Sequence, residues 1–191
     1  MARNLISFDW AMKRLLRSKA NYKVLEGFLS ELLKRNVKIE EILESESNRD
    51  TANDKYNIVD ILVRLDGKEL VIIEVQADAQ FDYFHRMLYG VAKIITDHMD
   101  LGAKYHEVKK VFSVSIVYFD LGNGTDYIYH CKSEFIGLND QSKFNLTEKQ
   151  KELYQKEYIY DIHPEYYIIK VNQFNDLAKN TLDEWIYFFK T

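Results

Sequence analysis

The sequence has very little cysteine and proline, and it has no long apolar run. Among 191 residues there is one cysteine, Cys131, and one proline, Pro164. A single cysteine closes no internal disulfide and leaves no paired-cysteine metal site, so a reduced, cytoplasmic setting is expected. No apolar run approaches the roughly 20 residues that span a bilayer, and the first residues lack a signal-peptide core. Neither a membrane protein nor a disulfide-stabilised secreted protein is therefore expected.

An excess of positive charge is also missing, since 26 lysines and arginines face 30 acidic residues and the net charge is −4. This balance argues against a broad phosphate-binding surface. It does not exclude nucleic acid, because an active site rich in carboxylates lowers the net charge while basic residues gather elsewhere. The chain has no repeat, low-complexity tract or Gly/Ser linker, so we expect residues 1–191 to form one domain.

Apolar periodicity predicts an alternation of helices and strands. Helices are expected over residues 8–17, 22–34, 81–98, 147–155 and 174–189, and strands over residues 37–43, 56–65, 69–76, 111–119, 127–131 and 166–171. This order predicts an α/β (mixed α+β) fold with a central mixed β-sheet flanked by helices.

Two of these predictions concern packing. In the helix over residues 81–98, one side carries a set of apolar residues at helical spacing, and we expect it to face the core. The members of this set are Phe84, Leu88, Val91, Ala92 and Ile95. The strand over residues 127–131 follows a turn at Gly122-Asn123-Gly124, so it is expected to pair antiparallel with the strand before that turn.

The most informative segment is the hairpin formed by residues 56–65 and 69–76, which meet at the turn signal Asp66-Gly67-Lys68. The run VIIEV in its second half is apolar at nearly every position, which is typical of a central strand covered on both faces. Two registers are open. A three-residue loop places Asp60 opposite Glu74, whereas a two-residue loop turns Asp60 to the other face of the sheet.

The three-residue loop is favoured for a chemical reason. It places the carboxylates of Asp60 and Glu74 opposite each other among aliphatic neighbours. Directly opposed like charges destabilise a sheet, and burial adds to the cost unless one group is protonated or a cation lies between them. A hard divalent ion such as Mg²⁺ fits this position, because it takes one or two carboxylates and leaves room for phosphate oxygens. A solvated pair on an exposed sheet face is the plainer alternative.

The hairpin lies within a longer stretch, KYNIVDILVRLDGKELVIIEVQADAQFDYFHRMLYG, which resembles the recombination-promoting nuclease/transposase family of the PD-(D/E)XK nuclease superfamily. The segments FDWAMKRLL, FLSELL and LDEWIYFFK extend the resemblance over most of the chain. It implies a restriction-endonuclease-like core and Mg²⁺-dependent hydrolysis of DNA, with Mn²⁺ as an alternative metal. It also implies that Asp60, Glu74 and the main-chain carbonyl of Val75 bind the metal. Gln76 stands where the superfamily usually has lysine.

Glutamine can orient a water molecule but carries no charge, so positive charge at the phosphate has to come from elsewhere. Arg86 and Lys55 are candidates for this role, and Tyr89, three residues after Arg86 on the same helix face, is a candidate substrate contact. Each has a plainer interpretation as well. Arg86 would pair with Asp82 on the helix surface, Tyr89 would be half-buried packing, and Gln76 would bond to loop backbone.

The sequence therefore predicts a metal-dependent DNA endonuclease linked to recombination or mobile elements. One alternative is a catalytically inactive module of the same fold that binds nucleic acid or protein. Another is an RNA nuclease, which would use the same chemistry. Cutting both strands of a duplex requires two active sites, so a homodimer is an expected assembly.

Overall fold

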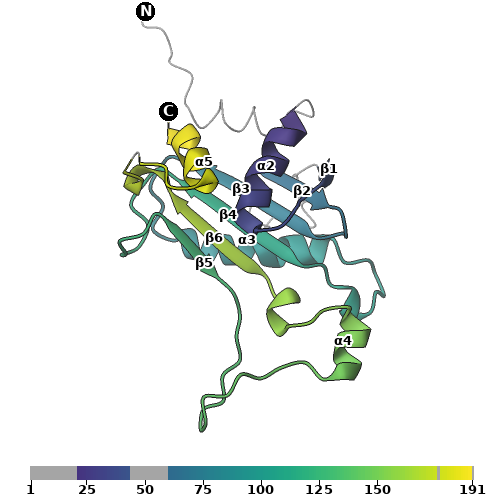
Figure 1. Cartoon of the computed structure of the whole chain (residues 1–191). Coiled ribbons are helices and arrows are strands. Elements are labelled where there is room, and N and C mark those ends of the chain that lie inside the picture. Colours follow the sequence, from purple (N-terminus) through teal and green to yellow (C-terminus); the bar gives the residue numbers. More distant parts are fainter. Residues whose placement is uncertain (1–20, 44–59, 176, 191) are drawn as a thin grey trace, which may run out of the picture.

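The structure is a computed structural model, and it describes residues 21–43, 60–175 and 177–190 (Figure 1). Six strands form one sheet in the order β1-β2-β3-β4-β6-β5. The strands are β1 (Ile39–Leu43), β2 (Ile61–Leu65), β3 (Leu70–Gln76), β4 (Val111–Val117), β5 (Ile128–Cys131) and β6 (Glu165–Lys170). β3, β4 and β6 run parallel, and the other pairings are antiparallel. The predicted mixed α/β fold, a central mixed sheet flanked by helices, is thereby confirmed.

Helices cover both faces of this sheet. The helices are α2 (Tyr22–Leu33), α3 (Tyr83–Asp97), α4 (Glu148–Tyr154) and α5 (Thr181–Lys190). α2 and α5 lie together on one face (Figure 1). There Phe28 and Phe189 meet edge to face with ring centroids 4.9 Å apart. α3 covers the opposite face and packs on Leu62, Leu70 and Ile72. No helix of the described segments is long and apolar enough to cross a membrane.

α3 links two parallel strands, and this connection fixes which end of the helix lies near which end of the sheet. β3 and β4 are parallel neighbours, with Glu74 in register with Ser115. A helix that connects two parallel strands runs back along the sheet. The amino end of α3 therefore lies at the carboxyl ends of β3 and β4.

The hairpin of β2 and β3 has the three-residue loop that the sequence favoured. Ile61 pairs with Ile73, and the Leu65 amide donates to the Glu69 carbonyl at 2.8 Å. Gly67 and Lys68 both adopt positive φ, 95° and 71°, which closes the loop without changing the register. β3 is central as predicted, and its residues are buried from Leu70 to Val75.

Two predictions were wrong, one about the partner of a strand and one about the start of a helix. β5 does not pair with β4, because β6 lies between them; β5 pairs with β6, where Ile128 is in register with Ile169. The last helix begins at Thr181 and not at residue 174. The Asn180 side chain accepts the Asp183 amide at 3.0 Å, which is a helix N-cap contact, and Phe174 before it is buried against the core.

The predicted core face of α3 was wrong in part: Val91 is buried and Ile95 packs against the core as expected, but the rest of the set is not buried. The helix buries Tyr83, Met87, Gly90, Val91 and Ile94, whereas Phe84, Leu88 and Ala92 are exposed. α3 carries two apolar stripes about 100° apart, and the packing on the sheet selects the one that contains Tyr83. The helix expected over residues 8–17 lies outside the described residues, as does the first part of the strand expected over residues 56–65.

Candidate active site

Asp60 and Glu74 lie opposite each other on the β2–β3 hairpin, on the face that α3 covers. Asp60 directly precedes β2, and the pairing of Ile61 with Ile73, extended by one residue, places it opposite Glu74. Side chains alternate along a strand, so these two carboxylates share a face with Leu62 and Ile72. This is the register that the sequence favoured, and it brings two acidic groups together at the carboxyl end of a central strand.

Glu74 is enclosed by residues of α3. Its side chain is 6% exposed. The Tyr83 hydroxyl donates to Oε2 at 3.2 Å, and Arg86 Nη2 lies 3.5 Å from Oε1. Tyr83 and Arg86 are three residues apart on the helix, so both reach the same carboxylate from one turn. The strand thus supplies the acid and the amino end of α3 supplies its two donors.

Burial raises the pKa of the Glu74 carboxyl above its usual value, and the nearby charge of Asp60 raises it further. Arg86 and the Tyr83 hydrogen bond act in the opposite direction, but they do not restore the ordinary pKa. Burial, followed by the charge of Glu74, raises the pKa of Tyr83 as well, so its phenol stays protonated and remains a donor. The site therefore holds a carboxylate that lacks full compensation by the described protein groups.

Asp60 is tied to the strand opposite it. Its Oδ2 accepts the Val75 amide N–H at 2.7 Å. In an antiparallel pair, a residue whose N–H points to the neighbouring strand also points its carbonyl there. The Val75 carbonyl therefore lies on the same strand edge as the Asp60 carboxylate, although the Val75 side chain is buried on the other face.

Of the other predicted site residues, Gln76 and Arg86 lie beside Glu74. Gln76 lies on the Glu74 face, and its Nε2 donates to the Asp78 carbonyl at 3.3 Å, the backbone contact of its plainer interpretation. Arg86 contacts Glu74 and Gln80; within the described segments its side chain forms no ion pair with Asp82. Tyr89 is exposed, and Lys55 lies outside the described residues.

Tyr83 is a residue of the candidate site that was not predicted from the sequence. It is fully buried, its ring meets Phe119 edge to face at 5.8 Å, and its hydroxyl is directed at Glu74. The available signal was its position four residues before Met87, which places both on one helix face. Phe84 and Leu88 have the same spacing, so the sequence did not distinguish the two faces.

This arrangement fits a divalent metal ion. Within the described segments no group of three or more His, Cys, Asp and Glu side chains could hold a metal. A site here would rest on two carboxylates and a main-chain oxygen, a set that Mg²⁺ uses together with water and phosphate oxygens. A cation beside Asp60 and Glu74 would also compensate the buried charge that raises the pKa of Glu74.

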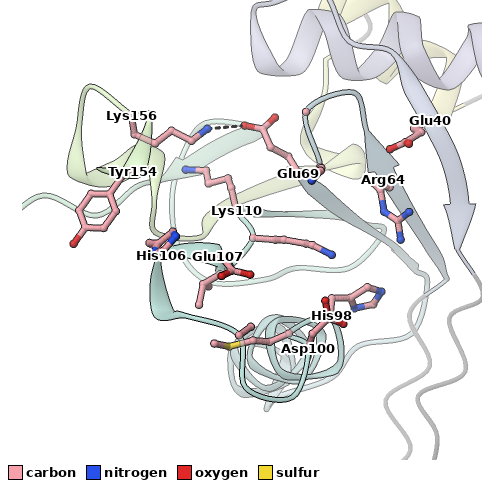
Figure 2. Close-up of a pocket in the computed structure, with 16 residues that line it drawn as sticks. Glu40, Arg64, Glu69, His98, Asp100, His106, Glu107, Lys110, Tyr154 and Lys156 are labelled. Carbon is pink, nitrogen blue, oxygen red and sulfur yellow. Dashed lines mark hydrogen bonds and ion pairs between the residues drawn. The ribbon is translucent and has the colours of Figure 1, made fainter. Parts of the chain in front are cut away.

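A second polar region lies at the amino ends of β3 and β4, away from these carboxylates. A cavity of about 490 Å³ opens there, lined by residues that include Arg64, Glu69 and Lys110 (Figure 2). Two of its basic groups are paired with acids: Arg64 lies 3.2 Å from Glu41, and Lys110 lies 2.6 Å from Glu165. These pairs neutralise part of the positive charge that could bind a phosphate, so the cavity is a weaker candidate than the hairpin site.

The sequence profile of the PD-(D/E)XK nuclease family transposases matches residues 6–191. The chain belongs to this family, and the resemblance that the sequence indicated is confirmed. The six-stranded mixed sheet with its flanking helices is consistent with the fold of PD-(D/E)XK nucleases, which generally use divalent metals. No curated protein and no solved structure gives a significant match.

Proposed function

We propose that the protein is a metal-dependent DNA endonuclease whose active site is built on Asp60 and Glu74. The observation that carries this proposal is the pair of opposed carboxylates at the end of the hairpin, one of them buried with a raised pKa. Such a pair destabilises a fold unless a cation joins it. A role in recombination or in mobile elements is supported by membership of the transposase family.

Asp60, Glu74 and the Val75 carbonyl would hold the ion. When bound, a divalent ion supplies an activated water and polarises the phosphate. Gln76, on the face of Glu74, would orient the attacking water through its amide. The water oxygen forms a bond to phosphorus, the bond to the leaving oxygen breaks, and the leaving oxygen takes up a proton.

Arg86 would supply the positive charge that glutamine lacks. Its guanidinium is 3.5 Å from Glu74, a long contact, and its side chain is about one-third exposed. A phosphate oxygen could therefore reach the same guanidinium from solvent. A charge placed where negative charge develops on the phosphate stabilises the transition state.

The direct test is cleavage of supercoiled plasmid and single-stranded DNA by the purified protein with Mg²⁺, with Mn²⁺ and with a chelator. We expect metal-dependent cutting by the wild type and none by Asp60→Ala. Equal cutting by both proteins would show that the activity arises elsewhere. Absence of cutting together with absence of metal binding would favour the catalytically inactive module.

Tyr83→Phe removes the hydroxyl that donates to Glu74 and keeps the ring. Because this hydrogen bond lowers the pKa of Glu74, its loss should raise that pKa further. A carboxyl with a higher pKa loses its charge at a higher pH, so the acid limb of the pH–rate profile should move upward. Cleavage near that limb should fall roughly tenfold, as for other partners of metal-binding groups.

The pH–rate profile separates this effect from general destabilisation. A variant that is only less stable would lose activity at all pH values in proportion to the unfolded fraction. An unchanged acid limb in Tyr83→Phe would show that the hydroxyl does not act on Glu74.

A further inference from the structure

We infer that Phe81 and Phe84, at the amino end of α3, stack on unpaired bases of the substrate, so that single-stranded DNA is preferred to duplex. This inference rests on the proposed nuclease function and names its substrate class. Phe81 is fully exposed, and Phe84 and Leu88 are each more than half exposed. The same helix already buries a separate apolar stripe in the core, so this second stripe is not needed to hold α3 on the sheet.

These two residues lie close in the chain to Tyr83, which belongs to the candidate active site. Phe84 directly follows Tyr83, whose hydroxyl donates to Glu74, and Phe81 precedes Tyr83 by two residues, at most about 7 Å of chain. In a strand that keeps its bases stacked as in duplex DNA, nucleotides rise by about 3.4 Å. A strand with one phosphate near Glu74 would therefore carry bases within a few nucleotides of both phenylalanines.

Phe84 also lies beside the loop that follows β4. A Cβ at Gly122, in the loop after β4, would lie 3.8 Å from the tip of its ring, so this loop supports one side while the rest faces solvent. A ring supported on one side and open on the other is suited to receive a flat partner. Phe84 thus has a neighbour from a different part of the chain, and more than half of it remains open to solvent.

The chemistry of the stripe favours bases over other occupants. Aromatic rings offer no charge to phosphate, but they stack on the face of any base that is not paired in a duplex. Arg86, on the same helix turn, would hold the adjacent backbone by charge, so aromatic and cationic groups lie together in one short segment. Duplex DNA keeps its bases stacked inside and would gain little from these rings.

Binding can be measured without cleavage. We would follow fluorescence anisotropy of labelled single-stranded DNA and of the matching duplex in the presence of a chelator. Phe81→Ala and Phe84→Ala should each weaken single-strand binding by about fivefold or more, the usual loss of one stacked base, and leave duplex binding nearly unchanged. Replacing one nucleotide by an abasic residue should weaken binding by the wild type. It should not weaken binding by the variant that carries both Phe81→Ala and Phe84→Ala.

Tyr105→Ala is the matched control, because Tyr105 is 92% exposed and lies beyond the far end of α3, a helix about 22 Å long. It should bind both DNAs as the wild type does. Equal losses for single strand and duplex, or wild-type binding by both phenylalanine variants, would overturn the inference. A change of sedimentation mass in these variants would overturn it too, because the stripe would then join two copies. Wild-type binding without any cleavage would reject only the nuclease function.

Discussion

Glu74→Gln should abolish DNA cleavage and at the same time make the folded protein more stable. The substitution removes a carboxylate from the proposed metal site, and we expect the cleavage rate to fall by about 10³-fold or more. Glutamine keeps the size of the side chain and can still accept from Tyr83. It does not carry the buried charge, so the desolvation that raises the pKa of Glu74 is relieved.

The sign of the stability effect depends on pH. The folded-state pKa of Glu74 is raised, so folding favours the protonated carboxyl. This contribution to stability is lost as the pH rises from the ordinary glutamate pKa of 4.5 through the folded-state pKa. At neutral pH the wild type therefore carries an unfavourable charge that Glu74→Gln lacks. The melting temperature of the variant should exceed that of the wild type at neutral pH, and the difference should shrink below pH 4.5.

Thermal unfolding in a chelator across this pH range, beside a cleavage assay, measures both effects. For a chain of this length each kcal/mol changes the melting temperature by about 2–4 °C. If Glu74→Gln is less stable than the wild type at neutral pH, the buried charge of Glu74 does not destabilise the fold, and this interpretation is contradicted. Retained cleavage would contradict its place in the active site.

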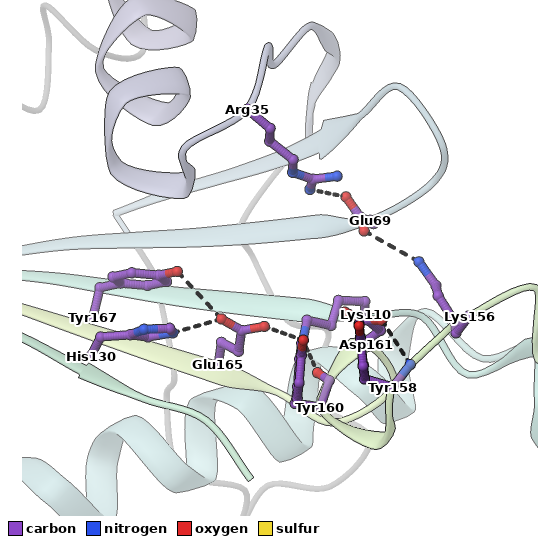
Figure 3. A network of polar contacts seen from close by, with 10 residues as sticks. All are labelled: Arg35, Glu69, Lys110, His130, Lys156, Tyr158, Tyr160, Asp161, Glu165 and Tyr167. Carbon is purple, nitrogen blue, oxygen red and sulfur yellow. Dashed lines mark hydrogen bonds and ion pairs between the residues drawn. The ribbon is translucent and has the colours of Figure 1, made fainter. Parts of the chain in front are cut away.

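The second large effect is expected at the far end of the sheet, where Lys110→Ala should destabilise the fold without abolishing cleavage. Lys110 and Glu165 form a buried ion pair at 2.6 Å, and His130 lies 2.6 Å from the other Glu165 oxygen (Figure 3). Burial raises the pKa of Glu165, but Lys110 and His130 outweigh it and hold that pKa below its usual value. Removal of Lys110 leaves a buried carboxylate beside His130 and the Tyr167 hydroxyl, which donates to Glu165 at 3.3 Å, and takes away the lysine that pairs with it.

Breaking such a pair costs about 3–5 kcal/mol, which corresponds to a fall of about 6–20 °C in melting temperature. The exposed pair of Lys143 and Glu134, at 2.8 Å, is a matched control, and Lys143→Ala should leave the melting temperature nearly unchanged. Lys110→Met with Glu165→Gln removes both charges and should recover much of the loss. Equal melting temperatures for the wild type and Lys110→Ala would show that the network adds no stability.

The hairpin site could be predicted from sequence because the interactions that fix it are local. The turn Asp66-Gly67-Lys68 sets the register within a few residues, and the register decides whether Asp60 meets Glu74. The confirmed register was chosen on the chemistry of these two carboxylates. Their catalytic roles, and those of Gln76 and Arg86, stay predictions.

The contacts that the sequence did not predict depend on tertiary packing. α3 offers one apolar stripe with Tyr83 and another with Phe84, and only the sheet beneath the helix selects between them. The position of β5 depends on β6, which comes more than 30 residues later and lies between β4 and β5. Neither the buried face of α3 nor the partner of β5 leaves a pattern within its own segment. Periodicity therefore predicted these elements but not what they pack against.

The central claim is that Asp60 and Glu74 hold one divalent ion between them. Calorimetric titration of Mn²⁺ or Mg²⁺ into the purified protein tests it most directly. Asp60→Ala removes one carboxylate of the site, and Lys143→Ala is the control that leaves the charge of the site unchanged. We predict one binding event in the wild type and in Lys143→Ala, and its loss in Asp60→Ala. Equal metal binding by Asp60→Ala and the wild type would contradict the account.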